Sequence, residues 1–113
     1  MAFSKAQQFV MDDDILHIVA NYCKALCYPG RVLIVRWLAS EGPKSAGEIS
    51  RFIALSRATT SYHLACLEKV GLITGFERGP HVTYVFNETA LPAMKFFLDT
   101  LFDEVEAGVQ SRR

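Results

Sequence analysis

Residues 54–73 read ALSRATTSYHLACLEKVGLI, and this stretch decides the fold. Ser56 is a residue type that caps helix N-termini, because its hydroxyl accepts a hydrogen bond from a free backbone N–H of the first turn. Apolar residues then recur at helical spacing, and Gly71 suits the left-handed conformation in which many helices end. We therefore predict a helix from about Arg57 to Val70.

A shorter helix precedes this one. Ser45-Ala46-Gly47-Glu48 has the spacing of a capping box, in which the serine hydroxyl and the glutamate carboxylate satisfy backbone donors at a helix start. The predicted helix spans about Ala46 to Ile53, and only a few residues separate it from the Ser56 cap. Two helices joined by so short a turn form a helix-turn-helix.

Two β-rich runs follow the pair of helices, Leu72–Arg78 and His81–Asn87. Gly79-Pro80 lies between them, and this dipeptide is typical of turns. The pattern predicts a β-hairpin.

The rest of the chain is predicted to be helical. We expect an amphipathic helix from about Ser4 to Leu26, a mostly buried helix from Arg31 to Ala39 and a final helix from about Thr89 to Ala107, followed by a frayed tail. Tyr28-Pro29-Gly30 is expected to break the chain between the first two. The predicted fold class is mainly α with a small β-hairpin: a winged helix-turn-helix of about five helices and a two-stranded wing.

The start of the first helix has two interpretations. Asp12, Asp13 and Asp14 cap a helix that begins there, or they lie on the exposed face of a longer helix that begins near Ser4.

Length and composition indicate a single folded domain over residues 1–113. Half of the residues are hydrophobic, which excludes a disordered or polybasic tail, and 12 basic residues balance 12 acidic ones. The charge is unevenly distributed, because residues 31–81 hold seven basic and four acidic residues, a balance of 7 − 4 = +3. Such segregation is expected of a protein with one surface that faces phosphate.

Residues 26–87 resemble the ArsR-type family of winged helix-turn-helix repressors. The motifs that carry the resemblance are LCYPGR (residues 26–31), ALSRATTSYHL (54–64) and LEKVGLI (67–73). The resemblance implies a DNA-binding dimer that releases its operator when an effector binds. It also implies that the terminal helices, about residues 4–27 and 89–107, pack against their symmetry mates, so that two recognition helices read a pseudo-palindromic site in double-stranded DNA.

An independent observation also favours a homodimer. The final helix carries a row of apolar side chains that a 113-residue monomer cannot easily cover, namely Met94, Phe97, Leu101 and Val105.

The candidate DNA-binding residues lie where a helix entering the major groove needs short polar side chains, near its N-terminus. They are Arg57, Ala58, Thr59, Ser61, Tyr62 and His63, with Lys44 and Ser45 at the start of the preceding helix as candidate phosphate contacts. For His63, a phosphate contact and a hydrogen-bonded histidine at the edge of the core both stay open. The opposite side of the helix is expected to pack inward through Thr60, Leu64, Leu67 and Val70.

Arg78 and His81 flank the hairpin tip and are the candidate contacts of the wing. We expect them to face the DNA backbone or the adjacent minor groove. The alternative is a surface hairpin whose arginine is simply solvated.

Two cysteines one helical turn apart, Cys23 and Cys27, are the candidate thiol sensor. The alternative is that both are small core residues, as we expect for Cys66 inside the recognition helix. No metal site is expected, because the third helix lacks a cysteine pair and the last helix lacks histidine. Its acidic residues Asp99, Asp103, Glu104 and Glu106 therefore read as a solvated face.

The sequence does not support an enzyme, a secreted protein or a membrane protein. The sequence has no nucleophile elbow, phosphate-binding loop, dinucleotide fingerprint or zinc-protease helix, so we expect neither an enzyme nor a cofactor. With no signal peptide or membrane-spanning run, we expect a cytoplasmic protein with reduced thiols and no membrane partner. The remaining alternative to a regulator is a winged helix used as a protein–protein interaction module.

Overall fold

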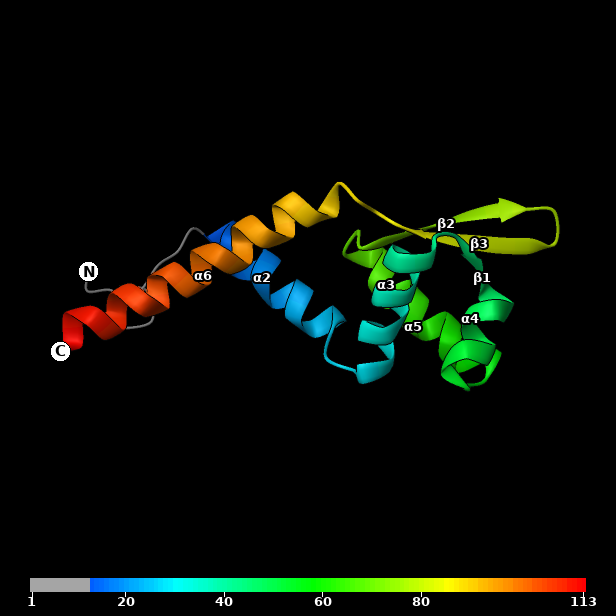
Figure 1. Cartoon of the computed structure of the whole chain (residues 1–113), viewed down its shortest axis with the longest axis horizontal. Helices are drawn as coiled ribbons and strands as arrows, with labels where there is room; N and C mark the ends of the chain where they lie inside the picture. Colours follow the sequence, from blue (N-terminus) through cyan, green and yellow to red (C-terminus); the bar gives the residue numbers. More distant parts are fainter. Residues whose placement is uncertain (1–12) are drawn as a thin grey trace.

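The computed structural model describes residues 13–113. Their element order is α2 (Asp13–Ala25), α3 (Pro29–Glu41), β1 (Lys44–Ser45), α4 (Ala46–Ile53), α5 (Arg57–Lys69), β2 (Ile73–Arg78), β3 (His81–Phe86) and α6 (Ala90–Arg112), as Figure 1 shows. The helix-turn-helix α4–α5 and the hairpin β2–β3 confirm the predicted winged helix-turn-helix. The open question about the start of the first helix concerns residues 4–12, which lie outside the described part.

The sheet has one strand more than predicted. Its order is β1-β3-β2, with all pairs antiparallel, and Lys44 lies opposite Tyr84. β1 has only two residues, too few to show the alternation by which a strand is recognised in a sequence. Because β1 leads directly into α4, this pairing fixes the start of α4 to the wing.

Helix α3 differs from the prediction in two ways. It begins at Pro29, where a chain break was expected, because proline suits the first helical position, which needs no N–H donor. It is also not mostly buried, since Val32 and Leu33 are 39% and 45% exposed. Only Arg31, Ile34 and Leu38 are buried, so α3 presents one face to the core and the other to solvent.

The core lies inside the helix-turn-helix body. Five fully buried side chains meet there: Ile34 of α3, Ile49 of α4, Leu64 and Leu67 of α5, and Leu72 at the start of the wing. Burying one such side chain stabilises a fold by about 1.5 to 3 kcal/mol. The inward side of α5 is therefore confirmed: Thr60, Leu64 and Leu67 are buried and Val70 is partly buried. This packing holds the opposite side of α5 toward solvent.

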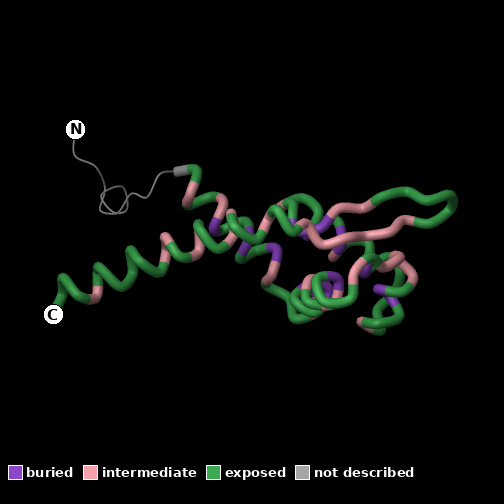
Figure 2. Tube along the Cα trace, turned by 45° about the horizontal axis from the view of Figure 1, so that its top comes forward, coloured by how far each residue is buried: buried purple, intermediate pink, exposed green. Residues whose placement is uncertain are grey.

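Helices α2 and α6 pack against each other at the end of the molecule away from the wing (Figure 1). The expected frayed tail is wrong, because α6 continues to Arg112. No residue of α6 is buried, and Figure 2 shows its far half exposed around its circumference. This projecting helix makes the molecule elongated, with extents of 57 × 29 × 24 Å. None of the described helices has the length and hydropathy that crossing a membrane requires.

Candidate nucleic-acid interface

The start of α4 is fixed by the predicted capping box. Ser45 Oγ accepts a hydrogen bond from the Glu48 backbone N–H at 3.1 Å, and Glu48 Oε1 accepts one from the Ser45 backbone N–H at 3.0 Å. The backbone and side-chain hydrogen bonds with Ser45 lower the pKa of the Glu48 carboxyl, so it stays ionised at the helix N-terminus. Lys44 lies beside this cap, with Nζ 3.9 Å from Glu41 Oε1 and 4.9 Å from the centre of the Trp37 ring.

The turn between α4 and α5 is held by hydrogen bonds at both ends. Ser50 Oγ donates to the Leu55 carbonyl at 2.6 Å, and the Leu55 N–H donates to the Ser50 carbonyl at 3.2 Å. On the α5 side, Ser56 Oγ accepts from the Thr59 N–H at 3.1 Å and confirms the predicted cap. The two helices therefore keep a fixed angle, and the first turns of α5 have a defined orientation.

The outer face of α5 carries the predicted side chains. Arg57, Ala58, Thr59, Ser61 and Tyr62 are all exposed, and Tyr62 is 64% exposed. They form a continuous polar surface over the first two turns, which we call the reading face. At this face the free backbone N–H groups of a helix start favour an anion.

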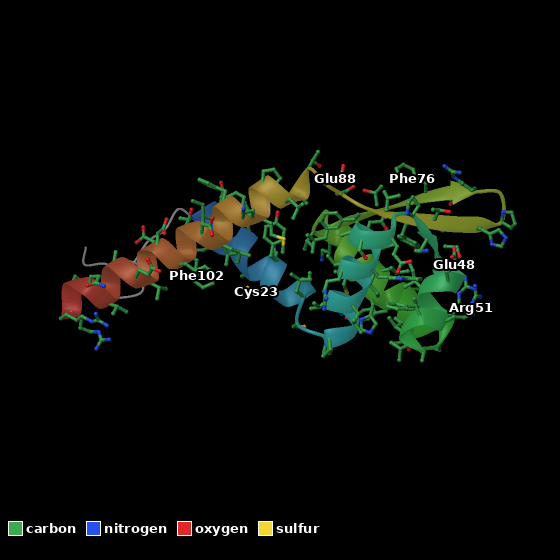
Figure 3. The ribbon with its side chains drawn as sticks, in the orientation of Figure 1. Cys23, Glu48, Arg51, Phe76, Glu88 and Phe102 are labelled. Carbon is green, nitrogen blue, oxygen red and sulfur yellow. The ribbon has the colours of Figure 1, made fainter. Side chains whose placement is uncertain are left out.

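Two arginines converge above Gly47 of α4. A Cβ atom built on Gly47 would lie 3.2 Å from Arg57 Nη1 and 3.5 Å from Arg51 Nη1. Neither guanidinium has an ion-pair partner among the described residues. Figure 3 shows Arg51 on α4, at the end of the molecule opposite the tip of α6. Two adjacent unpaired cations repel each other, and a phosphate placed between them would relieve that repulsion.

Arg51 was not among the site residues predicted from the sequence. Its signal was weak, because it is one exposed basic residue on a short helix, and its proximity to Arg57 depends on how α4 and α5 cross.

His63 lies at the inner edge of the reading face. Its Nδ1 accepts a hydrogen bond from Arg31 Nε at 2.9 Å, so the ring is neutral and carries its proton on Nε2. Partial burial, and then the charge of Arg31, lower the pKa of His63. This geometry supports the interpretation of His63 as a hydrogen-bonded histidine at the edge of the core.

Arg31 was not among the site residues predicted from the sequence, but it connects two helices at this site. It is only 3% exposed, and its Nη1 donates to the carbonyls of Lys24 and Ala25 at 3.3 Å each. Its guanidinium also lies 4.6 Å from the Tyr28 ring centre and 5.6 Å from that of Tyr62. One side chain thus joins the end of α2 to the recognition helix. The sequence signal was an arginine at the buried edge of a largely apolar helix.

The wing places its predicted residues at its tip. Arg78 and His81 face each other across the turn, both exposed, and Gly79 there has φ +60°. Phe76 is exposed on the same hairpin, as Figure 3 shows. Both candidate wing residues are therefore free to meet an external partner.

The cysteines are not where the core interpretation placed them. Cys23 and Cys27 are both exposed, and Cys66 is partly buried. The core-facing positions of α2 are Val19, Tyr22 and Ala25, which turns the Cys23 thiol toward solvent. Cys27 is not on this helix as expected, because α2 ends at Ala25, and it lies in the segment that leads to α3. Within residues 13–113 no group of three histidine, cysteine or acidic side chains could hold a metal ion.

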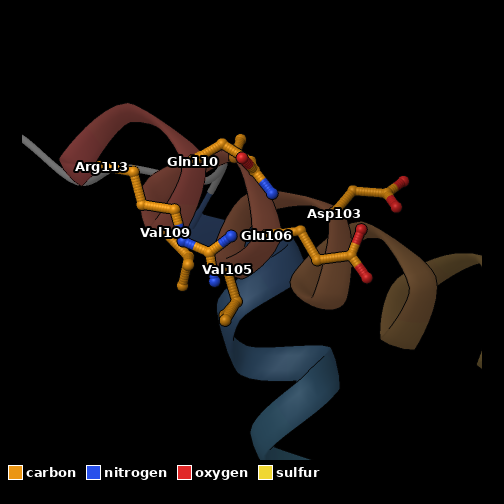
Figure 4. A pocket seen from close by; sticks show the side chains of 7 residues that line it. Asp103, Val105, Glu106, Val109, Gln110 and Arg113 are labelled. Carbon is orange, nitrogen blue, oxygen red and sulfur yellow. The ribbon is translucent and has the colours of Figure 1, made fainter.

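A shallow hollow of about 540 Å³ runs along the C-terminal half of α6 (Figure 4). Its described lining belongs to α6 and the last residue and mixes charged, polar and apolar side chains: Asp103, Val105, Glu106, Ala107, Val109, Gln110 and Arg113. With only one helix as its described wall, it is a feature of the exposed α6 surface.

Comparisons with known proteins point to one family. The model of the family described as "Bacterial regulatory protein, arsR family" matches residues 28–74, from α3 to the start of β2. The HTH-type transcriptional regulator YgaV of Escherichia coli (strain K12) is 35% identical over 75 residues, which are 66% of this chain and 76% of YgaV.

Solved structures agree with this fold. HlyU from Vibrio cholerae superposes with a TM-score of 0.65 at 28% identity, over 81% of this chain and 98% of HlyU. The homodimeric winged helix-turn-helix DNA-binding domain from Mycobacterium bovis has a TM-score of 0.65 at 23% identity, over 92% of each chain.

Proposed function

Because this chain belongs to the arsR family of bacterial regulatory proteins, we propose that it is a sequence-specific, homodimeric transcriptional repressor that an effector releases from double-stranded DNA. The observation that carries the proposal is the reading face of α5. It is polar and exposed, and fully buried Leu64 and Leu67 hold it outward from behind.

Base contacts are assigned to the reading face. Hydroxyl groups such as those of Thr59 and Ser61 reach base edges in the major groove, and an arginine binds guanine with two hydrogen bonds. Arg57 lies at the start of α5 next to α4, where rotation of its side chain would take it either to a base or to the adjacent phosphate.

Phosphate contacts are assigned to the surroundings of that face. Arg51 and Arg57 present unpaired charge above Gly47, and Lys44 and Ser45 lie at the start of α4. Arg78 and His81 at the wing tip would meet the backbone on the other side. These groups would position the protein on the duplex, while the reading face selects the sequence.

A second copy of the chain is assigned to the α2–α6 layer. Of the apolar row predicted on α6, Met94 and Phe97 pack against the core of the same chain and Leu101 is half-buried, so only Val105 is exposed as expected. Other large apolar side chains of α6 are exposed, namely Leu91, Phe96 and Phe102. A two-fold dimer through this surface would cover them and present two recognition helices to a pseudo-palindromic site. The Mycobacterium bovis domain, which has the same fold, is homodimeric, and this supports the proposal of a homodimer.

The effector is proposed to act through thiols or an organic ligand, because no metal-binding cluster is found within residues 13–113. Cys23 on α2 and Cys27 just after the end of that helix are both exposed, where an oxidant or a soft metal would reach them. A Cys23→Ser, Cys27→Ser variant would lose the response of DNA affinity to oxidant. An unchanged response would exclude this thiol sensor.

A specific observation keeps the protein-interaction module as the second candidate. Phe52 is 45% exposed at the end of α4 and stacks on Trp37 with ring centres 4.0 Å apart. Leu55 is exposed in the following turn. Exposed aromatic and apolar residues of this kind anchor protein partners more often than they contact DNA.

A fluorescence-anisotropy titration separates the two functions. The duplexes are the region upstream of the protein's own gene and a shuffled duplex of equal length, at several salt concentrations. The regulator is expected to prefer the first duplex, with an affinity that falls as salt rises. Binding that is insensitive to both sequence and salt would favour the interaction module.

A further inference from the structure

A groove of about 670 Å³ lies between α2, the start of α3 and the second half of α5. Its volume falls in the range of about 300 to 1,000 Å³ that is typical of small-molecule sites. Its described lining comes from these three elements and from Phe97 of α6.

The charge of this groove has one sign. Its three charged side chains, Lys24, Arg31 and Lys69, are all cations, and no carboxylate is among the described lining residues. The neighbouring carboxylate of Glu68 is directed elsewhere, because its Oε2 accepts a hydrogen bond from the Gly75 N–H in the wing at 3.1 Å. The groove therefore attracts an anion.

The burial of Arg31 is a second reason to expect an anion in the groove. Arginine is almost never as fully buried as this without a carboxylate or another anion beside it. Its hydrogen-bond acceptors here are neutral, two backbone carbonyls and the His63 ring. A buried guanidinium at the wall of an open groove thus lacks the charged partner that such groups usually have.

The remaining walls suit an apolar body. Part of the wall is hydrocarbon surface, from Ile18 of α2, Val70 at the end of α5 and Phe97 of α6. The rings of Tyr28 and Tyr62 add flat aromatic faces. A ligand that fits both kinds of wall has a compact aromatic part and one acidic group.

We propose that this groove binds a small aromatic anion, a carboxylate or sulfonate, and that its occupancy controls the recognition helix. The acidic group pairs with Lys24, Lys69 and Arg31, and the aromatic part lies against Val70 and Phe97. The occupied groove can affect the recognition helix because Arg31 is hydrogen-bonded both to the end of α2 and to His63 of α5. An anion that draws the guanidinium toward itself weakens the bond to His63 and shifts Tyr62. The regulatory half of this inference rests on the proposed function.

The site is tested first without DNA. The probe is anilinonaphthalene sulfonate, an aromatic anion whose fluorescence rises on binding, and its uncharged counterpart is phenylnaphthylamine. Lys24→Gln with Lys69→Gln is expected to weaken sulfonate binding about fivefold to tenfold, because two exposed cations at the groove are lost together. Binding of the uncharged probe should not change. Lys95→Gln, on exposed α6 and outside the groove, is the matched control.

Three results would overturn the site. The double variant could bind the sulfonate as tightly as the parent, or the uncharged probe could bind the parent as tightly as the sulfonate. Probe binding that falls as rising protein concentration drives dimerisation would assign the groove to the second copy.

The regulatory half is tested by repeating the DNA titration with and without the sulfonate. By linkage, a ligand that weakens DNA binding must itself bind less tightly to the DNA complex. A lower DNA affinity in the parent but not in the double variant supports control by the groove, and equal affinities in the parent overturn it. A parent that binds no DNA even without the probe refutes the proposed function and leaves the probe-binding result standing.

Discussion

Replacing Arg31 by methionine tests how the recognition helix is connected to the rest of the molecule. Methionine fills a similar volume but donates no hydrogen bond. The change leaves three acceptors without their donor, namely His63 Nδ1 at 2.9 Å and the carbonyls of Lys24 and Ala25 at 3.3 Å.

The expected loss in the free energy of unfolding is the difference between two opposing contributions. An unsatisfied buried acceptor costs about 1 to 3 kcal/mol, and the loss here is smaller for the two longer bonds. Removing the guanidinium also recovers its desolvation cost, which offsets part of the loss. We expect the free energy of unfolding to fall by about 2 to 3 kcal/mol. With a urea dependence on the order of 1 to 3 kcal/mol per molar, the midpoint falls by about 0.7 to 3 M.

Urea unfolding followed by the fluorescence of Trp37, the only tryptophan of the chain, measures this change. Parent and variants are compared at equal protein concentration, because dimerisation would contribute to stability. Arg36→Met is the matched control, since Arg36 is exposed on the same helix. A loss in Arg31→Met no larger than about 0.5 kcal/mol, the size expected for a surface substitution, would refute the reasoning.

Three further predictions concern the same helices. Thr60 Oγ1 is buried without a hydrogen-bond partner among the described residues, so Thr60→Val is expected to raise the free energy of unfolding by about 1 kcal/mol; a loss of stability in urea would show that the hydroxyl is satisfied. Ala54 ends α4 in the left-handed conformation with φ +55°, so Ala54→Gly should raise the free energy of unfolding by about 0.5 to 1 kcal/mol. A lower midpoint of thermal unfolding in the variant would contradict this prediction. The lowered pKa of His63 means that the unfolded chain binds the proton more readily, so its contribution to stability is present above about pH 6.5 and is lost as the pH falls through the folded pKa. His63→Gln should flatten the fall in urea midpoint below pH 6.5, and an equally steep fall in both proteins would contradict this assignment.

The parts of the fold that were predictable depend on neighbours in the sequence. Ser45 and Glu48 satisfy each other within one helical turn, and Ser56 caps its own helix, so a reader of the sequence alone can locate both helix starts. Gly71, with φ +80°, marks the end of α5 for the same reason.

The parts that were not predictable depend on contacts between distant residues. Arg31 and His63 are 32 positions apart. Arg51 and Arg57 are closer in sequence, but both approach Gly47 only because of the angle between α4 and α5. The exposure of Cys23 depends on which face of α2 packs inward, and that of Cys27 on where α2 ends. Helical spacing shows that Tyr22 and Leu26 share a stripe with these cysteines, but it does not show where that stripe ends.

The central claim is that the reading face of α5 selects the DNA sequence. Its most direct test is the ratio of the dissociation constants for the shuffled and the upstream duplex, measured for the parent and for a Ser61→Ala, Tyr62→Ala variant. Both side chains are exposed, so the variant is expected to fold. The ratio should fall at least about fivefold, since one base-edge contact contributes about 1 to 3 kcal/mol of discrimination. A folded variant that keeps the parent's ratio would contradict the claim.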